Sequence, residues 1–241
     1  MIDIHSHILP GLDDGAKNVE DSIAMAKQAV EQGFDTIIAT PHHRNGSYEN
    51  YKTDILAQVK LVNDALLDAG VPLTVLAGQE TRINGDMITD LESDQLLPLN
   101  ETSYLFVELP SNHVPRYTKQ LLFDLQVYGV KPIIVHPERN KQLMEDPDIL
   151  YEFVKNGTLT QVTAASVIGK FGKKIQKFTH QLIEANLTHF VASDTHNTTT
   201  RGFCMEEAYQ TIEEKFGTMR LYEFMENTQF LVADKTVVGD E

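Results

Sequence analysis

Short apolar runs recur along the whole chain and predict its strands. They lie at residues 2–8, 35–41, 73–77, 104–109, 132–136, 159–164 and 189–193. Most are continuous rather than alternating, as in TIIAT, LFVEL and PIIVH, which is typical of strands buried on both faces of a parallel sheet. Their spacing of roughly 30 residues is the length of one strand-and-helix unit.

The segments between these runs carry helical periodicity. Apolar residues repeat every three to four positions over 19–30, 51–66 and 171–182, and each segment is followed by glycine or asparagine: Gly33, Gly70 and Asn186. Both residue types suit the left-handed backbone that often ends a helix. One or two closing helices are expected over about 203–226, with a short C-terminal tail after them.

Seven repeats of strand and helix with short links predict one α/β domain over residues 1–241. The expected architecture is a closed or nearly closed seven-stranded parallel barrel, a TIM-like (β/α)7 fold, because such barrels typically need ~250 residues. A doubly wound open sheet is the alternative.

The chain is strongly acidic, with 35 Asp and Glu against 20 Lys and Arg and a net charge of −15. This charge excludes generic nucleic-acid binding, which depends on Lys and Arg displacing counterions from phosphates. No apolar stretch approaches the ~18 residues of a membrane span, and the first residues lack a signal-peptide pattern. The only cysteine, Cys204, has no partner for an internal disulfide. We expect a cytoplasmic protein that is not inserted into a membrane.

Residues that bind metals gather at the predicted strand ends. His5 and His7 point to the same side of an extended strand because they are two positions apart. Six of the seven runs deliver His, Asp or Glu at their ends, and the C-terminal ends of parallel strands meet on one face of a barrel. The candidate ligands are His5, His7, Asp14, His42, Glu80, Glu108, His136, Asp194 and His196.

The chemistry of this set predicts divalent metal ions. Imidazoles and carboxylates without a thiolate suit Mn, Fe, Zn or Mg, and nine groups exceed the three or four that one catalytic ion uses. Two or three clustered ions are therefore expected. Asp13 and Asp14 adjoin, and the residues alone leave open which of them points inward. Ser166, just after the sixth run, is interpreted as a helix N-cap only.

Six short elements carry a resemblance to a known family: HSH at 5–7, GLDDG at 11–15, TPHH at 40–43, Glu80, HPER at 136–139 and SDTH at 193–196. They are similar to the motifs of the polymerase and histidinol phosphatase (PHP) family of metallohydrolases. VHPERN, and VASDTHN followed by RGF, resemble its bacterial capsular and exopolysaccharide tyrosine-protein phosphatases. The likeness covers essentially the whole chain.

The resemblance implies a distorted seven-stranded barrel and assigns roles to the candidates. It places His5, His7, Glu80 and Asp194 on one metal, Glu80, Glu108 and His136 on a second, and Asp14, His42 and His196 on a third. It favours Asp14 over Asp13 and makes Glu80 a bridge. Arg139 and Arg201 become the phosphate-binding and transition-state cations. Manganese is the metal most often associated with such enzymes, although iron and zinc occur among relatives.

Phosphoester hydrolysis needs a nucleophile, charge stabilisation and help for the leaving group. Clustered ions lower the pKa of bound water from about 15.7 toward about 7, so a metal-activated hydroxide is expected. Arg139 and Arg201 would hold the phosphate, and a protonated His42 or His196 would assist the leaving phenolate. Cysteine-dependent phosphatase chemistry is excluded, because Cys204 is followed six positions later by Gln210 rather than by arginine.

The expected function is a manganese-dependent protein-tyrosine phosphatase. From the resemblance alone, its substrate is a phosphotyrosine-containing protein, an autophosphorylating tyrosine kinase that controls capsular or exopolysaccharide assembly. Two alternatives stay open: a small-molecule phosphomonoesterase such as histidinol phosphatase, and a non-catalytic regulator of the kinase in which the metals stabilise a docking surface.

Overall fold

The computed structural model describes residues 1–237 and residue 239. Within this part of the chain, nine strand segments form two sheets in which every pairing is parallel, with the orders β1-β2-β4 and β3-β5-β6-β7-β8-β9. The strands are β1 (Ile2–Ser6), β2 (Thr36–Ala39), β3 (His42–His43), β4 (Thr74–Ala77), β5 (Glu80–Arg82), β6 (Tyr104–Glu108), β7 (Lys131–Val135), β8 (Leu159–Thr163) and β9 (Phe190–Ala192). The α/β class and the parallel strands confirm the sequence prediction.

Two of the predicted runs are each followed by an additional short strand, β3 after β2 and β5 after β4, which is why seven runs become nine segments. β2 and β3 are separated at Pro41, which has no N–H to donate to a neighbouring strand. β4 and β5 are separated at Gly78, where a Cβ would lie 2.8 Å from side-chain atoms of both Ile38 and Leu99. The hydrogen-bonded pairing is therefore two sheets rather than the single seven-stranded sheet that the sequence predicts.

The two sheets share one interior. An isolated bridge between Ser6 and Thr195 joins β1 to the segment after β9, and the amide of His7 donates to the Thr195 carbonyl over 2.9 Å. Side chains from strands of both sheets pack in one buried cluster that includes Ile4, Ile38, Phe106, Ile133 and Phe190. A second, larger cluster lies between the strands and the surrounding helices.

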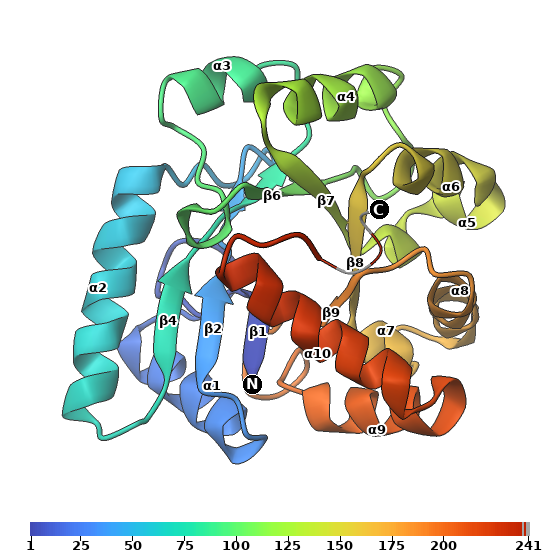
Figure 1. Ribbon diagram of the computed structural model, residues 1–241. Coiled ribbons are helices and arrows are strands. Elements are labelled where there is room, and N and C mark those ends of the chain that lie inside the picture. Colours follow the sequence, from blue (N-terminus) through green and yellow to red (C-terminus); the bar gives the residue numbers. More distant parts are fainter. Residues whose placement is uncertain (238, 240–241) are drawn as a thin grey trace.

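The helices surround the strands (Figure 1). They are α1 (Val19–Glu31), α2 (Lys52–Asp68), α3 (Met87–Glu92), α4 (Thr118–Tyr128), α5 (Lys141–Glu145), α6 (Asp148–Lys155), α7 (Ala164–Val167), α8 (Lys173–Glu184), α9 (Met205–Phe216) and α10 (Thr218–Val232), with short 3-10 turns η1 (Leu99–Glu101) and η2 (Pro137–Arg139). The closing helices thus run beyond the predicted limit of 226. The end of the predicted tail, at 238 and 240–241, lies outside the described residues.

Helix α10 covers the N-terminal ends of the strands. Figure 1 shows it lying across β1 and β9, and both strands contact it. Leu231 at its end packs into the inner cluster, and the Tyr104 hydroxyl at the start of β6 donates to the Lys235 carbonyl over 2.5 Å. Functional side chains therefore have to gather at the opposite, C-terminal ends. None of the helices within 1–237 has the length and apolar character that a membrane span requires.

Candidate metal centre

The candidate ligands lie where the sequence predicts them, at the C-terminal ends of strands or just beyond. His5 is the second-last residue of β1, Glu108 is the last residue of β6, and His136 directly follows β7. Glu80 begins β5, the short strand that follows the third predicted run. All nine side chains approach at least one other member of the set within 4.0 Å.

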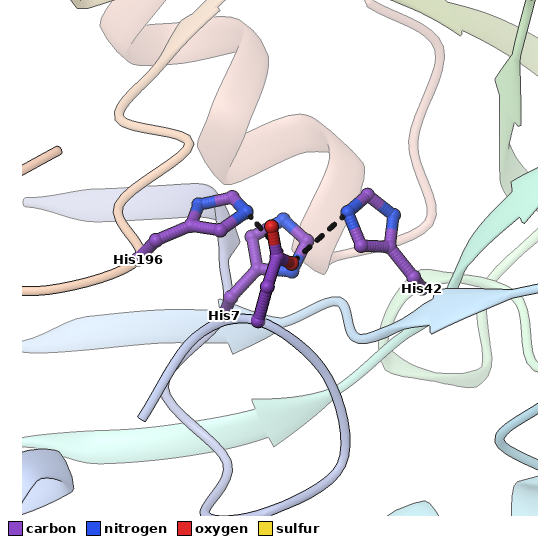
Figure 2. Close-up of side chains that lie close together, drawn as sticks. His7, His42 and His196 are labelled. Atoms are coloured by element: carbon purple, nitrogen blue, oxygen red, sulfur yellow. Dashed lines mark ion pairs between the residues drawn. The ribbon is translucent and has the colours of Figure 1, made fainter. Parts of the chain in front are cut away.

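One group of candidate ligands combines three imidazoles with an exposed carboxylate. Ligand atoms of His7, Asp14, His42 and His196 all lie within 4.8 Å of one another. Asp14 Oδ1 is 3.5 Å from His42 Nε2 and 3.4 Å from His196 Nε2. Figure 2 shows the rings of His7, His42 and His196 turned toward a common point. The Asp14 side chain is 47% exposed, so this group faces the surface of the molecule.

Glu80 lies at the centre of the whole cluster. Its Oε2 is 3.3 Å from His5 Nε2, 3.4 Å from His7 Nε2 and 2.9 Å from His42 Nδ1, and its Oε1 is 2.7 Å from His136 Nε2. It belongs to two of the three groups that could hold an ion, one with His5 and His7 and one with His42 and Glu108. A carboxylate with neighbours on both oxygens is suited to bridge two cations.

Several buried polar atoms in this cluster lack a hydrogen bond. Among the described residues, Glu80 Oε2, His42 Nδ1 and His196 Nε2 make none, although Glu80 Oε2 and His42 Nδ1 are close together. An unpartnered buried polar atom carries a desolvation cost, which a bound cation would offset. The residues therefore fit divalent metal ions. Which ion each residue would bind stays a prediction.

The histidines of β1 are oriented by partners behind them. His7 Nδ1 is 2.6 Å from Asp13 Oδ2, and His5 Nδ1 is 2.8 Å from Gln161 Oε1. Metal-binding histidines commonly pair their second nitrogen in this way, which leaves the first free for the ion. Asp13 also accepts hydrogen bonds from the amides of Gly15 and His42. Asp13 thus supports His7, while its neighbour Asp14 faces the cluster.

Burial and neighbouring charges shift the pKa values of the cluster in opposite directions. Burial lowers the pKa of His7, but the carboxylates of Asp13, Asp194 and Glu80 together outweigh it and raise that pKa well above the usual value. Burial raises the pKa of Glu80, but His42 and His5 hold it well below the usual range. Burial and the charge of Arg139 lower the pKa of His136 to about 3. Glu80 is thus ionised and His136 neutral at neutral pH, the forms that bind metals.

The two predicted phosphate-binding arginines stand at the rim of the cluster. Arg139 Nη1 is 2.8 Å and Arg201 Nη2 is 3.0 Å from Asp194 Oδ2. The other oxygen of Asp194 faces His5 and His7, at 3.5 Å and 3.3 Å. One carboxylate therefore links the imidazoles to both guanidinium groups. The arginine side chains are 23% and 32% exposed, so a ligand can reach them.

The sequence reasoning missed several residues that support this cluster. Arg82 forms a two-pronged ion pair with Glu108, with both contacts at 2.9 Å, because these residues are paired in register between β5 and β6. The sequence offered Asp13 only as an alternative metal ligand and Gln161 is uncharged, so no pattern pointed to their roles as partners of His7 and His5. The interpretation of Ser166 is wrong: Thr163 occupies the N-cap position of α7, and the Ser166 hydroxyl bonds a buried carboxylate.

Comparison with known proteins places the chain in a family. The family model for capsular polysaccharide synthesis proteins of the CpsB/CapC type matches residues 1–233. The chain belongs to the CpsB/CapC family. The family match confirms the resemblance drawn from the sequence motifs.

Relatives within the CpsB/CapC family cover nearly the whole chain. The tyrosine-protein phosphatase YwqE of Bacillus subtilis is 48% identical over 98% of this chain and 93% of its own length. The tyrosine-protein phosphatase CpsB of Streptococcus agalactiae serotype III is 31% identical over 96% of this chain and 98% of its own. One solved structure comes from a study of YwqE and of CpsB from Streptococcus pneumoniae, which it calls unique metal-dependent tyrosine phosphatases. This structure has a TM-score of 0.96 at 48% identity, and the match covers 98% of this chain and 96% of that one.

Proposed function

We propose that this chain is a metal-dependent protein-tyrosine phosphatase of capsular or exopolysaccharide synthesis. Its substrate is the phosphotyrosine of an autophosphorylating tyrosine kinase, in the cytoplasm. The observation that carries the proposal is the joint presence of the ligand cluster around Glu80 and the two rim arginines, Arg139 and Arg201. Further support comes from the tyrosine-protein phosphatases that are 48% and 31% identical to the chain.

The proposed metal content is two to three divalent ions, with manganese as the proposed metal. The ligands are the nine residues of the cluster, in the three sets given by the PHP resemblance, with Glu80 as the bridge. Bound ions of this kind acidify water and neutralise charge on a phosphoryl group. The ligand carboxylates supply negative charge, and the ligand imidazoles bind such ions in their neutral form.

Arg139 and Arg201 are proposed to hold the phosphate. A planar guanidinium group offers paired N–H donors that match two phosphate oxygens, which is why arginine is preferred at phosphate sites. Both groups already converge on Asp194 Oδ2, so they reach the phosphate in a restricted orientation. His42 and His196 are proposed to assist the leaving phenolate. Either can do so only while no ion is bound to its ring, because a metal-binding imidazole is neutral.

Two cavities are lined by residues of the cluster and its rim. A cavity of about 270 Å³ is lined by His42, Arg139 and Arg201, among others. A second one of about 450 Å³ is lined by Asp14 and His196, among others. The first cavity, which is lined by both arginines, is proposed to receive the phosphate group. We also propose that residues 1–241 form a single PHP-type domain whose two sheets make up a distorted seven-stranded barrel.

The proposal is tested by turnover with added manganese. A phosphotyrosyl peptide, a phosphoseryl peptide and histidinol phosphate are compared as substrates for the purified protein and for His136→Ala. We expect hydrolysis of the phosphotyrosyl peptide in preference to the other two, and its loss in His136→Ala. Preference for histidinol phosphate would move the assignment to a small-molecule phosphatase. The absence of turnover with tightly bound manganese would indicate a non-catalytic regulator.

A further inference from the structure

The turn that carries Arg139 is attached to the body of the protein by a buried carboxylate. Glu138 lies in η2 and is fully buried. Its Oε1 accepts three hydrogen bonds: from the Thr163 amide over 3.0 Å, from the Thr163 hydroxyl over 2.9 Å and from the Ser166 hydroxyl over 2.7 Å. These donors lie at the end of β8 and in α7, a corner of the fold that contributes none of the candidate metal ligands.

The turn has little to hold it in place by itself. It is a short 3-10 turn, closed by the amides of Arg139 and Asn140, which donate to the carbonyls of His136 and Pro137 over 3.0 Å and 3.1 Å. His136 lies in the left-handed backbone region at φ 38° and ψ 49°, which is unfavourable for a residue other than glycine. Short 3-10 turns have poorer hydrogen-bond geometry than α-helices. Contacts from outside the turn therefore decide where Arg139 stands.

The guanidinium group is restricted at its other end. It lies over the ring of Phe171 at 5.6 Å from the ring centroid and forms the ion pair with Asp194. The Glu138 contacts hold the backbone at the base of the Arg139 side chain, and Phe171 and Asp194 contact its guanidinium group. Both ends of a long, flexible side chain are thereby restrained.

We propose that Glu138, through Thr163 and Ser166, is a positioning residue that aligns Arg139 with the phosphate of the substrate. This inference rests on the proposed function, because it takes phosphate binding as the task of Arg139. The β8–α7 corner then acts on the substrate without touching it. The expected result of weakening the corner is lower affinity for phosphate with an intact set of metal ligands.

The test uses manganese-loaded protein with Ser166→Ala or Thr163→Val, each of which removes one hydroxyl donor to Glu138. Calorimetry measures the affinity for inorganic phosphate, and kinetics separate KM from kcat for a phosphotyrosyl peptide. We expect each change to weaken phosphate binding and raise KM about fivefold, the size of one net hydrogen bond. Manganese stoichiometry should stay unchanged. The matched control is Thr179→Val, another buried threonine, whose hydroxyl bonds the Ile175 carbonyl within α8.

The same substitutions in an Arg139→Ala background decide whether the effect passes through Arg139. We expect Ser166→Ala to have no further effect on phosphate affinity there, because the group that it positions is gone. Glu138→Gln, which keeps the acceptor oxygen, should preserve phosphate affinity within about twofold.

Three results would each overturn the inference. The first is that Ser166→Ala and Thr163→Val bind phosphate as tightly as Thr179→Val does, and the second is that Ser166→Ala lowers phosphate affinity just as much when Arg139 is replaced by alanine. The third is that these variants lose manganese in parallel with their loss of phosphate affinity. Calorimetry with inorganic phosphate does not require turnover. Failure of the unsubstituted protein to hydrolyse phosphotyrosine would therefore overturn the proposed function separately.

Discussion

Gly15 illustrates how single residues define the metal cluster. A Cβ at this position would lie 2.0 Å from the carbonyl oxygen of His7 and 2.5 Å from its Cβ. The loop that carries Asp13 and Asp14 can approach His7 only because residue 15 has no side chain. The Gly15 amide in turn donates to Asp13 Oδ1 over 2.9 Å, which holds the carboxylate that orients His7.

We expect Gly15→Ala to destabilise the protein by about 2–3 kcal/mol, as overpacking in a rigid region does, and to weaken manganese binding. Denaturant unfolding and metal titration measure the two effects. Gly85→Ala is the matched control, because a Cβ there meets nothing within 4 Å; it should change stability by less than about 0.5 kcal/mol. Equal stability of the two variants would contradict the close packing described here.

His196 provides a pH-dependent prediction at the same scale. Burial and the neighbouring His7 lower its pKa to about 4, whereas an unfolded chain titrates near pH ~6.5. At pH values between these two pKa values, the unfolded chain binds a proton at His196 and the folded protein does not. The contribution of His196 to the free energy of unfolding therefore falls as the pH falls. In metal-free protein, His196→Gln should reduce the pH slope of the unfolding free energy by up to about 1.4 kcal/mol per pH unit in this window. An identical slope in both proteins would refute the lowered pKa.

Strand β8 shows that an element can serve the metal cluster without supplying a candidate ligand. Its sequence, LTQVT, contains no acidic residue, histidine or cysteine. Yet the Gln161 side chain holds His5 Nδ1, and its amide nitrogen donates to the Val162 carbonyl over 2.8 Å. The sequence pattern of either strand alone does not reveal that a residue on one strand orients a histidine on the other.

We expect Gln161→Leu to lower manganese affinity about 10- to 100-fold, the usual cost of losing a residue that orients a metal-binding histidine. The change should leave the fold intact, since the leucine fills a similar volume. Metal titration checks affinity and circular dichroism checks the fold. Gln126→Leu, on α4 and with its side-chain amide bonded to the Leu122 carbonyl, serves as the control. Unchanged affinity in Gln161→Leu would show that His5 needs no such support.

At the scale of the whole molecule, the metal cluster connects the two sheets. His5 comes from the three-stranded sheet, while His42, Glu80 and Glu108 come from the six-stranded sheet. Ions bound between these residues would add to the contacts that join the sheets, which include the Ser6–Thr195 bridge, the hydrogen bonds of Ser193 to Asp3 and a shared interior. Metal binding should therefore stabilise the entire fold rather than one loop.

We expect a chelator to abolish phosphatase activity and to lower the melting temperature in one cooperative transition. A ligand present at 100 times its dissociation constant stabilises the folded state by about 2.7 kcal/mol, so the effect should be readily measured by calorimetry. Manganese added back should restore both properties. A melting temperature that is unaffected by removal of all metal would contradict a cluster that joins the sheets.

The sequence by itself determined the parallel strands, the helices between them and the chemical identity of the candidate ligands. These are local properties: a continuous apolar run, a repeat of three to four residues, and an imidazole or carboxylate at a strand end. The placement of the candidates at one end of the strands also followed, because parallel strands share a direction.

Only the tertiary structure decided how the runs pair and which polar residues support the cluster. The split of the strands at Pro41 and Gly78, the bond of Ser166 to Glu138 and the inward turn of Asp13 toward His7 all depend on neighbours. His5 and Gln161 are 156 positions apart. Contacts over such separations depend on the packing of the whole chain, which no local pattern of residues encodes.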